Sequence, residues 1–286
     1  MEIDLQEKYE KLLQVIRPCG RAAVAFSGGV DSTLLAYAAA EALGRENMVC
    51  ITARAASFPD REFKEAEEFC NSKGIRFKVL NFNEFEVAGF SLNPPDRCYL
   101  CKRELFSGII ALANDYFRAN ISSPDAQFIL PVILEGSNAD DDNDYRPGKK
   151  AIKELGVKSP LRAAGLGKAD IRMISKSLGL ASWDKQSFAC LASRFVYGEE
   201  ITPEKLDMVG KAEQFLLDKG YKTLRVRIHG KENFIARIET IPEESPRILT
   251  EPLRSEIIDY FKSLGFSYVT LDLQGYRTGS MNEVFV

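Results

Sequence analysis

The stretch RAAVAFSGGVDSTLL, residues 21–35, decides the fold of this chain. A short apolar run suited to a buried strand, residues 22–26, ends abruptly in Ser-Gly-Gly-Val-Asp-Ser, and the apolar spacing that follows is typical of a helix. Gly28 and Gly29 allow the backbone to turn tightly and to approach a ligand closely. The helix start beyond them directs unpaired amides and the positive end of its dipole at whatever binds there. The segment therefore predicts a phosphate-binding strand-loop-helix.

Side chains of this loop refine the prediction. Ser27 and Ser32 add hydroxyl donors for a phosphate. Asp31 would repel a bare phosphate, so it favours a divalent cation, Mg²⁺, that bridges its carboxylate to phosphate oxygens. A serine-capped helix after a glycine turn is the structural alternative. Because the chain contains neither a Walker A sequence nor GxGxxG, neither a P-loop NTPase nor a simple dinucleotide fold is predicted.

The composition limits the size, the compartment and the partners. With 286 residues, 45% of them hydrophobic, the chain is long enough for about two domains. A formal net charge of −3 argues against general nucleic-acid binding. The N-terminus is charged throughout and no long apolar run follows, so we expect a soluble, cytoplasmic protein without membrane contact. The six cysteines should then be reduced, which favours metal binding or catalysis over disulfides.

Apolar runs alternate with helical patterns along the first part of the chain. The runs cover residues 22–26, 48–52, 75–80 and 128–134, and the helical patterns cover residues 32–42, 60–71 and 102–113. This βαβαβαβ order predicts an α/β fold, a parallel sheet with helices on both faces. Ligands of such sheets bind at the carboxyl ends of the strands, where we expect both the SGGVDS loop and Thr52.

The pattern changes after residue 200. Helices are expected at residues 203–219 and 252–264, and strands at residues 223–228, 234–239 and 268–273. We therefore predict a first domain of residues 1–197 and a small α+β domain of residues 198–286, which would serve substrate binding or oligomerisation. Arg225 and Arg227 share one face of an expected strand and suit a forked clamp on phosphate or carboxylate. An edge strand with exposed basic residues is the alternative.

A second polar loop, LEGSNADDDNDYRPG, covers residues 134–148. Its residues Gly136, Ser137 and Asn138 would lie on the same sheet edge as the first loop. The spacing from Asp140 lacks the glycine and the glutamate of an EF-hand, which excludes a calcium loop. A polar loop with helix-capping residues is the structural alternative.

Three cysteines stand in segments that suit chemistry. Cys98 and Cys101 are three residues apart where a helix begins, so both sulfurs face one side and the helix dipole favours thiolates. Cys190 has Arg194 close enough in sequence to help hold an anion. By itself the CxxC pair could be half of a zinc site, a redox pair or an accident of a reduced core. Three thiolates could also hold a 4Fe-4S cluster whose remaining iron is open to hydrosulfide.

The other cysteines, Cys19, Cys50 and Cys70, are expected to be small buried hydrophobes without chemistry. His229, the single histidine of the chain, is expected in a loop or in the core.

At residues 27–32 the chain resembles the PP-loop ATP pyrophosphatases, whose signature is SGGxDS. That resemblance implies a parallel five-stranded-type sheet, cleavage of ATP between its α and β phosphates, and adenylylation of a substrate. Further segments, GSNADD, DYRPG, SPLR at residues 159–162, CLASR at residues 190–194 and TLRVR at residues 223–227, extend the resemblance to the LarE family over nearly the whole chain. Members of that family insert sulfur into a nickel-pincer nucleotide precursor, pyridinium-3,5-biscarboxylic acid mononucleotide.

The LarE resemblance also implies roles for particular residues. The ATP-binding set would comprise Ser27, Gly28, Gly29, Asp31, Ser32, Thr52, Gly136 and Arg146, and the mononucleotide-binding set Ser193, Arg194, Arg225 and Arg227. One branch of the family gives up the sulfur of a single cysteine, which Cys190 matches, and is left with dehydroalanine. Another branch carries three cysteines and a cluster, and Cys98 and Cys101 fit that branch. We therefore favour sulfur transfer through a cluster; the resemblance further implies a ring-like homo-oligomer.

Several alternatives stay open at this point. Transfer RNA thiolation uses the same adenylation but would need a more basic surface. Amide-forming synthesis of the NAD or GMP synthetase type explains SGGVDS and leaves the cysteines unused. A nucleotide-binding regulator would bind ATP without turnover. Glu199, Glu200 and Glu239 could hold a metal near the arginines, and the sequence does not fix their role.

Overall fold

The computed structural model describes residues 3–120, 129–143, 148–186, 189–277 and 279–285. It divides into two compact units, Met1–Val87 with Cys98–Phe188, and Ala88–Arg97 with Ala189–Val286. These units do not divide at residues 197–198, because residues 88–97 pack with the chain just after Arg194. The Asn93 carbonyl accepts from the Gly198 amide and the Ser91 carbonyl from the Ile201 amide, both at 2.9 Å.

A parallel sheet with the strand order β3-β2-β1-β4 forms the centre of the first unit. The strands are β1 (Ala22–Ala25), β2 (Met48–Arg54), β3 (Phe77–Asn81) and β4 (Val132–Leu134). Val24 of β1 lies opposite Cys50 on one side and Leu134 on the other. A single parallel bridge between Leu134 and Lys158 stands where a fifth strand was expected, so the sheet of the described residues has four strands.

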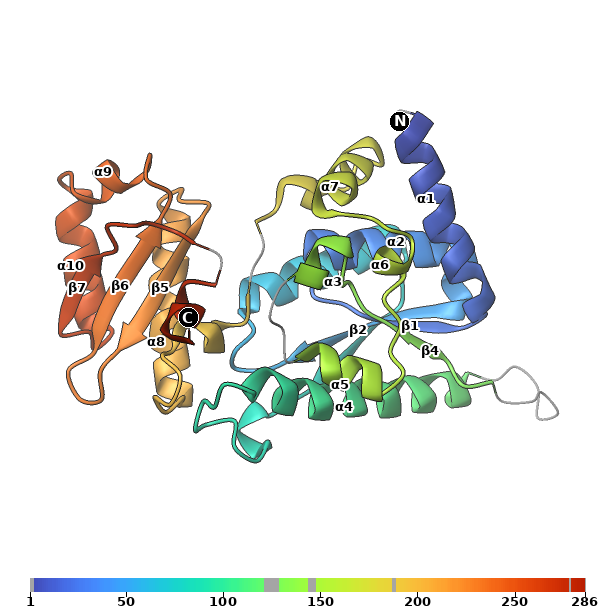
Figure 1. Cartoon of the computed structure of the whole chain (residues 1–286), viewed down its shortest axis with the longest axis horizontal. Helices are drawn as coiled ribbons and strands as arrows, with labels where there is room; N and C mark the ends of the chain where they lie inside the picture. Colours follow the sequence, from blue (N-terminus) through green and yellow to red (C-terminus); the bar gives the residue numbers. More distant parts are fainter. Residues whose placement is uncertain (1–2, 121–128, 144–147, 187–188, 278, 286) are drawn as a thin grey trace. The chain divides into compact units, whose positions relative to one another are not determined.

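Helices cover both faces of this sheet (Figure 1). They are α1 (Ile3–Ile16), α2 (Val30–Leu43), α3 (Asp60–Lys73), α4 (Arg97–Ala119), α5 (Gly148–Glu154), α6 (Pro160–Ala163) and α7 (Lys168–Ser177). One core includes Leu12, Leu34 and Ile171 from α1, α2 and α7, and the other includes Phe106 of α4 and Ile152 of α5. Both faces of the sheet are therefore buried, which accounts for the continuous apolar run of β1 and confirms the predicted α/β fold.

The second unit contains a separate sheet of β5 (Leu224–His229), β6 (Ile235–Thr240) and β7 (Tyr268–Leu271). β5 is antiparallel to β6, and β6 is parallel to β7. The helices are α8 (Pro203–Asp218), α9 (Ser245–Ile248) and α10 (Leu253–Ser263), and Phe215 of α8 stacks on Tyr260 of α10 with ring centroids 4.5 Å apart. The predicted α+β elements are present with small shifts at their ends.

Short 3-10 helices complete the chain: η1 (Arg17–Cys19), η2 (Arg45–Asn47), η3 (Glu84–Glu86), η4 (Ala139–Asn143), η5 (Ala181–Asp184), η6 (Leu191–Arg194) and η7 (Ser280–Phe285). Across the described ranges, every helix is too short or too polar to cross a bilayer.

Candidate active site

The SGGVDS loop connects the carboxyl end of β1 to the start of α2, as the sequence predicts. The hydroxyls of Ser27 and Ser32 are 3.1 Å apart, and Ser32 Oγ also donates to the Gly29 carbonyl at 3.2 Å. Gly28 has a φ of 68°, which favours glycine. The N-cap of α2 is Gly29, and no side chain caps the helix. The first turn of α2 therefore presents its amides to the loop, the arrangement that binds anions.

Thr52 supports this loop from the neighbouring strand. Its side chain is only 1% exposed, and its hydroxyl donates to the Phe26 carbonyl at 2.7 Å, directly before the loop begins. Because the Thr52 hydroxyl is buried and already donates to a backbone carbonyl, a contact between Thr52 and a nucleotide would involve the Thr52 backbone.

Asp31 lies in the first turn of α2 and is held by two residues from distant parts of the chain. Its carboxylate forms an ion pair with Lys168 Nζ and accepts from Asn138 Nδ2 at 3.3 Å. Lys168 opens α7, and its amide donates to Asp140 of the second loop at 2.7 Å. The sequence analysis did not predict Lys168 as a site residue. The signal available in the sequence was the helical pattern that begins at Lys168, a few residues after the SPLR segment.

Gly136 brings the second polar loop against the first. A Cβ on Gly136 would lie 3.2 Å from the Ser32 amide nitrogen and 3.4 Å from the Asp31 Cβ, so a larger residue would push the loops apart. The neighbouring Glu135 accepts from the amide of Ser137 at 3.0 Å and from its hydroxyl at 2.8 Å. The structure thus joins the two loops at one sheet edge. Arg146, expected to bind ATP, lies outside the described residues.

Asp31 supplies the carboxylate of the SGGVDS loop, where the sequence predicts a magnesium ion shared with a nucleotide. Within the part of the chain that the structure describes, no three His, Cys, Asp or Glu side chains stand close enough to hold a metal ion. Mg²⁺ commonly takes one or two carboxylates together with substrate phosphates and water. The Asp31 side chain is 22% exposed and pairs with the Lys168 ammonium group, so Mg²⁺ would have to replace Lys168 at this carboxylate.

The candidate sulfur-carrying cysteines are accessible. Cys98 and Cys101 lie in the first turn of α4, where the first thiol is exposed and the second half-buried. Cys190 is exposed at the N-cap of η6. Cys98 and Cys101 belong to one helix, and Cys190 belongs to the other compact unit. Because residues three apart share a helix face, the pair fits two ligands of one metal centre.

The remaining cysteines are buried, as expected. Cys50 and Cys70 have 0% exposure and lie beside each other on β2 and α3. Burial, and then the hydrogen bond with Cys70, raises the pKa of the Cys50 thiol well above its usual value. Neither thiol is suited to nucleophilic chemistry.

The arginines expected to bind substrate are buried in the second unit. Arg194 is 0% exposed, and its guanidinium donates to both carboxylate oxygens of Glu213, at 2.7 and 2.9 Å. Arg227 donates to Glu239 at 2.7 Å and to the Ser193 carbonyl at 3.0 Å. The alternative of an exposed basic edge strand is wrong, because Arg225 and Arg227 are only 6% and 5% exposed.

Arg225 lies on the same face of β5, with its guanidinium 5.1 Å from the centre of the Tyr276 ring. Burial lowers the pKa of Arg225, and the positive charge of Arg194 lowers it further. Such a buried group would gain from an added anion, so the arginine face remains a candidate for phosphate binding.

Two of the three glutamates considered as metal ligands, Glu199 and Glu239, have other partners. Glu239 is fully buried and accepts from Arg227 and Ser280, and it also pairs with Arg237 at 3.2 Å. Glu199 accepts from the Gly230 amide at 3.2 Å. His229 ends β5, and burial lowers the pKa of its imidazole. We therefore assign no metal to Glu199 and Glu239.

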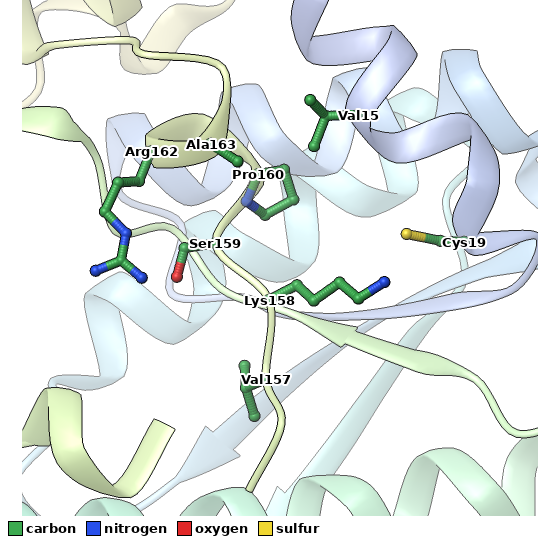
Figure 2. A pocket seen from close by; sticks show the side chains of 8 residues that line it. All are labelled: Val15, Cys19, Val157, Lys158, Ser159, Pro160, Arg162 and Ala163. Atoms are coloured by element: carbon green, nitrogen blue, oxygen red, sulfur yellow. The ribbon is translucent and has the colours of Figure 1, made fainter. Parts of the chain in front are cut away.

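A cavity of about 300 Å³ lies beside the edge of the first sheet (Figure 2). It is lined by Val15, Cys19, Val157, Lys158, Ser159, Pro160, Arg162 and Ala163, so it includes part of the SPLR segment. The Lys158 side chain extends toward Cys19, whose thiol pKa is raised by burial and lowered by the lysine. No residue of the SGGVDS loop lines this cavity, which separates it from the candidate active site.

A parallel sheet that ends in an SGGVDS loop, with a carboxylate in the first helical turn, defines the chain as a PP-loop ATP pyrophosphatase. Residues 6–97 match the family model described as NAD synthase. The chain is 35% identical to pyridinium-3,5-bisthiocarboxylic acid mononucleotide synthase of Lactiplantibacillus plantarum, over 98% of this chain and 95% of the synthase. It therefore belongs to the LarE family, and it is an ATP-dependent enzyme that forms AMP and pyrophosphate.

Two further relatives place the chain. It is 42% identical to an uncharacterized protein of Synechocystis over 98% of both chains. It is 46% identical to the NH(3)-dependent NAD(+) synthetase of Methanococcoides burtonii, but over only 23% of this chain and 26% of that synthetase. The similarity to the bisthiocarboxylic acid synthase thus covers far more of the chain than the similarity to the NAD(+) synthetase.

Proposed function

We propose that this protein adenylylates a carboxylate of pyridinium-3,5-biscarboxylic acid mononucleotide and converts it into a thiocarboxylate. The observation that carries the proposal is the full-length similarity to a synthase named for the bisthiocarboxylic product. The exposed thiol of Cys190 supports it, since an amide-forming synthetase has no use for a sulfur nucleophile. The net charge of −3 favours a small substrate over transfer RNA.

In the first half-reaction, ATP phosphates lie over the amides of Gly28 and Gly29 at the start of α2. Lys168 releases Asp31 and turns to a phosphate oxygen. Mg²⁺, when held by Asp31, supplies positive charge that stabilises the phosphates. An oxygen of the substrate carboxylate attacks the α-phosphorus, the bond to the β-phosphate oxygen breaks, and pyrophosphate leaves. The product is an acyl-adenylate, which has a good leaving group in AMP.

In the second half-reaction, a sulfur nucleophile displaces AMP from the acyl carbon. A 4Fe-4S cluster held by Cys98, Cys101 and Cys190 would supply hydrosulfide at its open iron. In the sacrificial alternative, the Cys190 thiolate attacks instead and forms a thioester. A base then removes the Cα proton as the Cβ–S bond breaks, which gives dehydroalanine and the thiocarboxylate. In both routes Arg225 and Arg227 hold the phosphate of the mononucleotide, with Ser193 and Arg194 as support.

The test measures both half-reactions with purified protein. Pyrophosphate release with ATP, Mg²⁺ and the mononucleotide, followed by mass spectrometry of the product, should show mononucleotide-dependent turnover and a thiocarboxylate. Pyrophosphate release that is indifferent to the mononucleotide, or an amide product when ammonia is present, would overturn the proposal. Binding of ATP without any turnover would likewise overturn the proposal.

The sulfur route is tested separately on protein purified without oxygen. Ultraviolet-visible and electron paramagnetic resonance spectra, with iron and sulfide counts, are compared for wild type, Cys98→Ala, Cys101→Ala and Cys190→Ala. Loss of a cluster in all variants supports transfer through the cluster. A cluster-free protein in which Cys190 is converted to dehydroalanine after turnover rules the cluster out and supports the sacrificial route.

A further inference from the structure

Lys185 contacts the outer side of the SGGVDS loop, a contact that sequence reasoning did not anticipate. Its Nζ donates to the Gly28 carbonyl at 3.2 Å. The same Nζ lies 2.7 Å from a carboxylate oxygen of Glu62 and 2.6 Å from one of Glu65, both on α3. The lysine side chain is only 16% exposed. Lys185 therefore connects the loop to α3 in a largely desolvated position, where hydrogen bonds to charged groups are strong.

The loop and α3 are also in direct contact at this point. A Cβ on Gly28 would lie 3.1 Å from the Ala66 Cβ, so glycine allows the loop to pack closely on the helix. Glu62 is 2% exposed, and it pairs with Arg61 at 3.3 Å as well as with Lys185. Two cations thus surround one buried carboxylate, which fixes the position of the ammonium group beside the loop.

The backbone around Lys185 is itself anchored to α7. Arg172 donates through Nη1 to the Trp183 carbonyl and through Nη2 to the Lys185 carbonyl, both at 2.8 Å. Although Lys185 lies on an irregular segment, these hydrogen bonds fix its backbone relative to α7. Rigid support of this kind is what a residue needs if it is to orient another group.

The Gly28 carbonyl and the Gly29 amide belong to one planar peptide group. In a trans peptide the C=O and N–H bonds point in opposite directions, so a carbonyl held by Lys185 turns the Gly29 N–H away from α3. In the ligand-free loop the Gly29 N–H donates to Ser27 Oγ at 3.5 Å, a long hydrogen bond that a phosphate oxygen would replace. We propose that Lys185 is a positioning residue that locks this peptide so that the Gly29 N–H faces the nucleotide phosphates. The proposal depends only on ATP use and not on the identity of the sulfur acceptor.

The experiment must separate this role from simple neutralisation of Glu62. Lys185→Met would leave the buried Glu62 carboxylate with Arg61 as its remaining cation and could destabilise the protein. The informative variant is therefore Glu62→Gln/Lys185→Met, which removes the charges of both residues. Lys176→Met serves as control, because the exposed Lys176 lies on the same part of the chain and stacks on Trp183 at 4.5 Å. Affinity for α,β-methylene-ATP with Mg²⁺ is measured by calorimetry, without any acceptor substrate.

We expect the double variant to melt like Glu62→Gln, to bind the analogue about tenfold more weakly than wild type, and to show a shifted Gly29 amide resonance before nucleotide is added. Lys185→Arg keeps the positive charge and should retain most of the wild-type affinity for the analogue. Lys176→Met should change neither this affinity nor the Gly29 amide resonance. Wild-type affinity in the double variant, or an unmoved Gly29 amide in ligand-free protein, would overturn the proposal. Failure of sulfur transfer with the ATP measurements as expected would count against the proposed function alone.

Discussion

Two ion pairs, one from each unit, differ in how far their charged groups are exposed to solvent. In the first unit, Asp31 and Lys168 form an ion pair whose side chains are 22% and 31% exposed. In the second unit, Arg194 and Glu213 form an ion pair with exposures of 0% and 1%. A partly exposed ion pair can exchange partners at a small cost in free energy, because water solvates the separated charges. A buried ion pair cannot be separated without leaving a desolvated charge. The first pair is therefore suited to ligand exchange and the second to holding a fold.

The largest effect should follow from breaking the buried pair. Arg194→Met removes the cation and leaves Glu213 buried without it, which we expect to lower the free energy of unfolding by about 3–5 kcal/mol. Urea unfolding followed by circular dichroism measures the change. Arg254→Met is the matched control, because Arg254 pairs with Glu251 on the surface of the same unit and should contribute at most about 1 kcal/mol. Equal stability of the two variants would contradict a structural role for Arg194.

Breaking the Asp31–Lys168 pair should lower enzyme activity rather than protein stability. Asp31→Asn keeps the size of the side chain and removes its charge, so we expect pyrophosphate release to fall by about 10²–10³-fold, which is the scale for loss of one preorganised charge-stabilising group. The melting temperature should stay near that of wild type. Asp115→Asn, an exposed change on α4, should leave both quantities unchanged. If Asp31→Asn released pyrophosphate at the wild-type rate, Asp31 could not be the proposed magnesium ligand.

A smaller effect should come from separating the two loops. Gly136→Ala places a methyl group 3.2 Å from the Ser32 amide nitrogen, and overpacking of this kind costs about 1–3 kcal/mol. Because the displaced atoms are backbone atoms of the nucleotide loop, we expect weaker ATP binding in calorimetry. In Gly210→Ala of α8 the new methyl group meets only the end of the Leu191 side chain, so this variant should bind ATP normally.

Local signals in the sequence predicted the framework of the first unit. Apolar runs and helical spacing gave the order of strands and helices, and the glycines marked the loop at the end of β1. Strand ends were less certain. The apolar run of residues 128–134 was expected to be one strand, yet β4 begins at Val132, and Ile129 and Leu130 are 64% and 62% exposed. Apolar character alone does not distinguish a buried strand from an exposed approach to it.

Pairings between distant residues could not be read from the sequence. Lys168 lies 137 residues from Asp31, and no local pattern links them. The burial of Arg194 depends on Glu213, which α8 supplies, and that of Arg227 depends on Glu239 of the neighbouring strand. A basic residue on an amphipathic strand is exposed or buried according to such partners, and these emerge only when the elements pack.

In the ligand-free loop, the charges of Asp31 and Lys168 neutralise each other. Free Mg²⁺ arriving alone must displace an ammonium group from the carboxylate, and a free triphosphate arriving alone meets a carboxylate. In the proposed first half-reaction, the Mg²⁺–ATP complex would satisfy both residues at once, with the metal at Asp31 and a phosphate oxygen at Lys168. By thermodynamic reciprocity, each component then raises the affinity for the other by the same factor. A loop that works in this way would bind the metal and the nucleotide together more tightly than it binds either one alone.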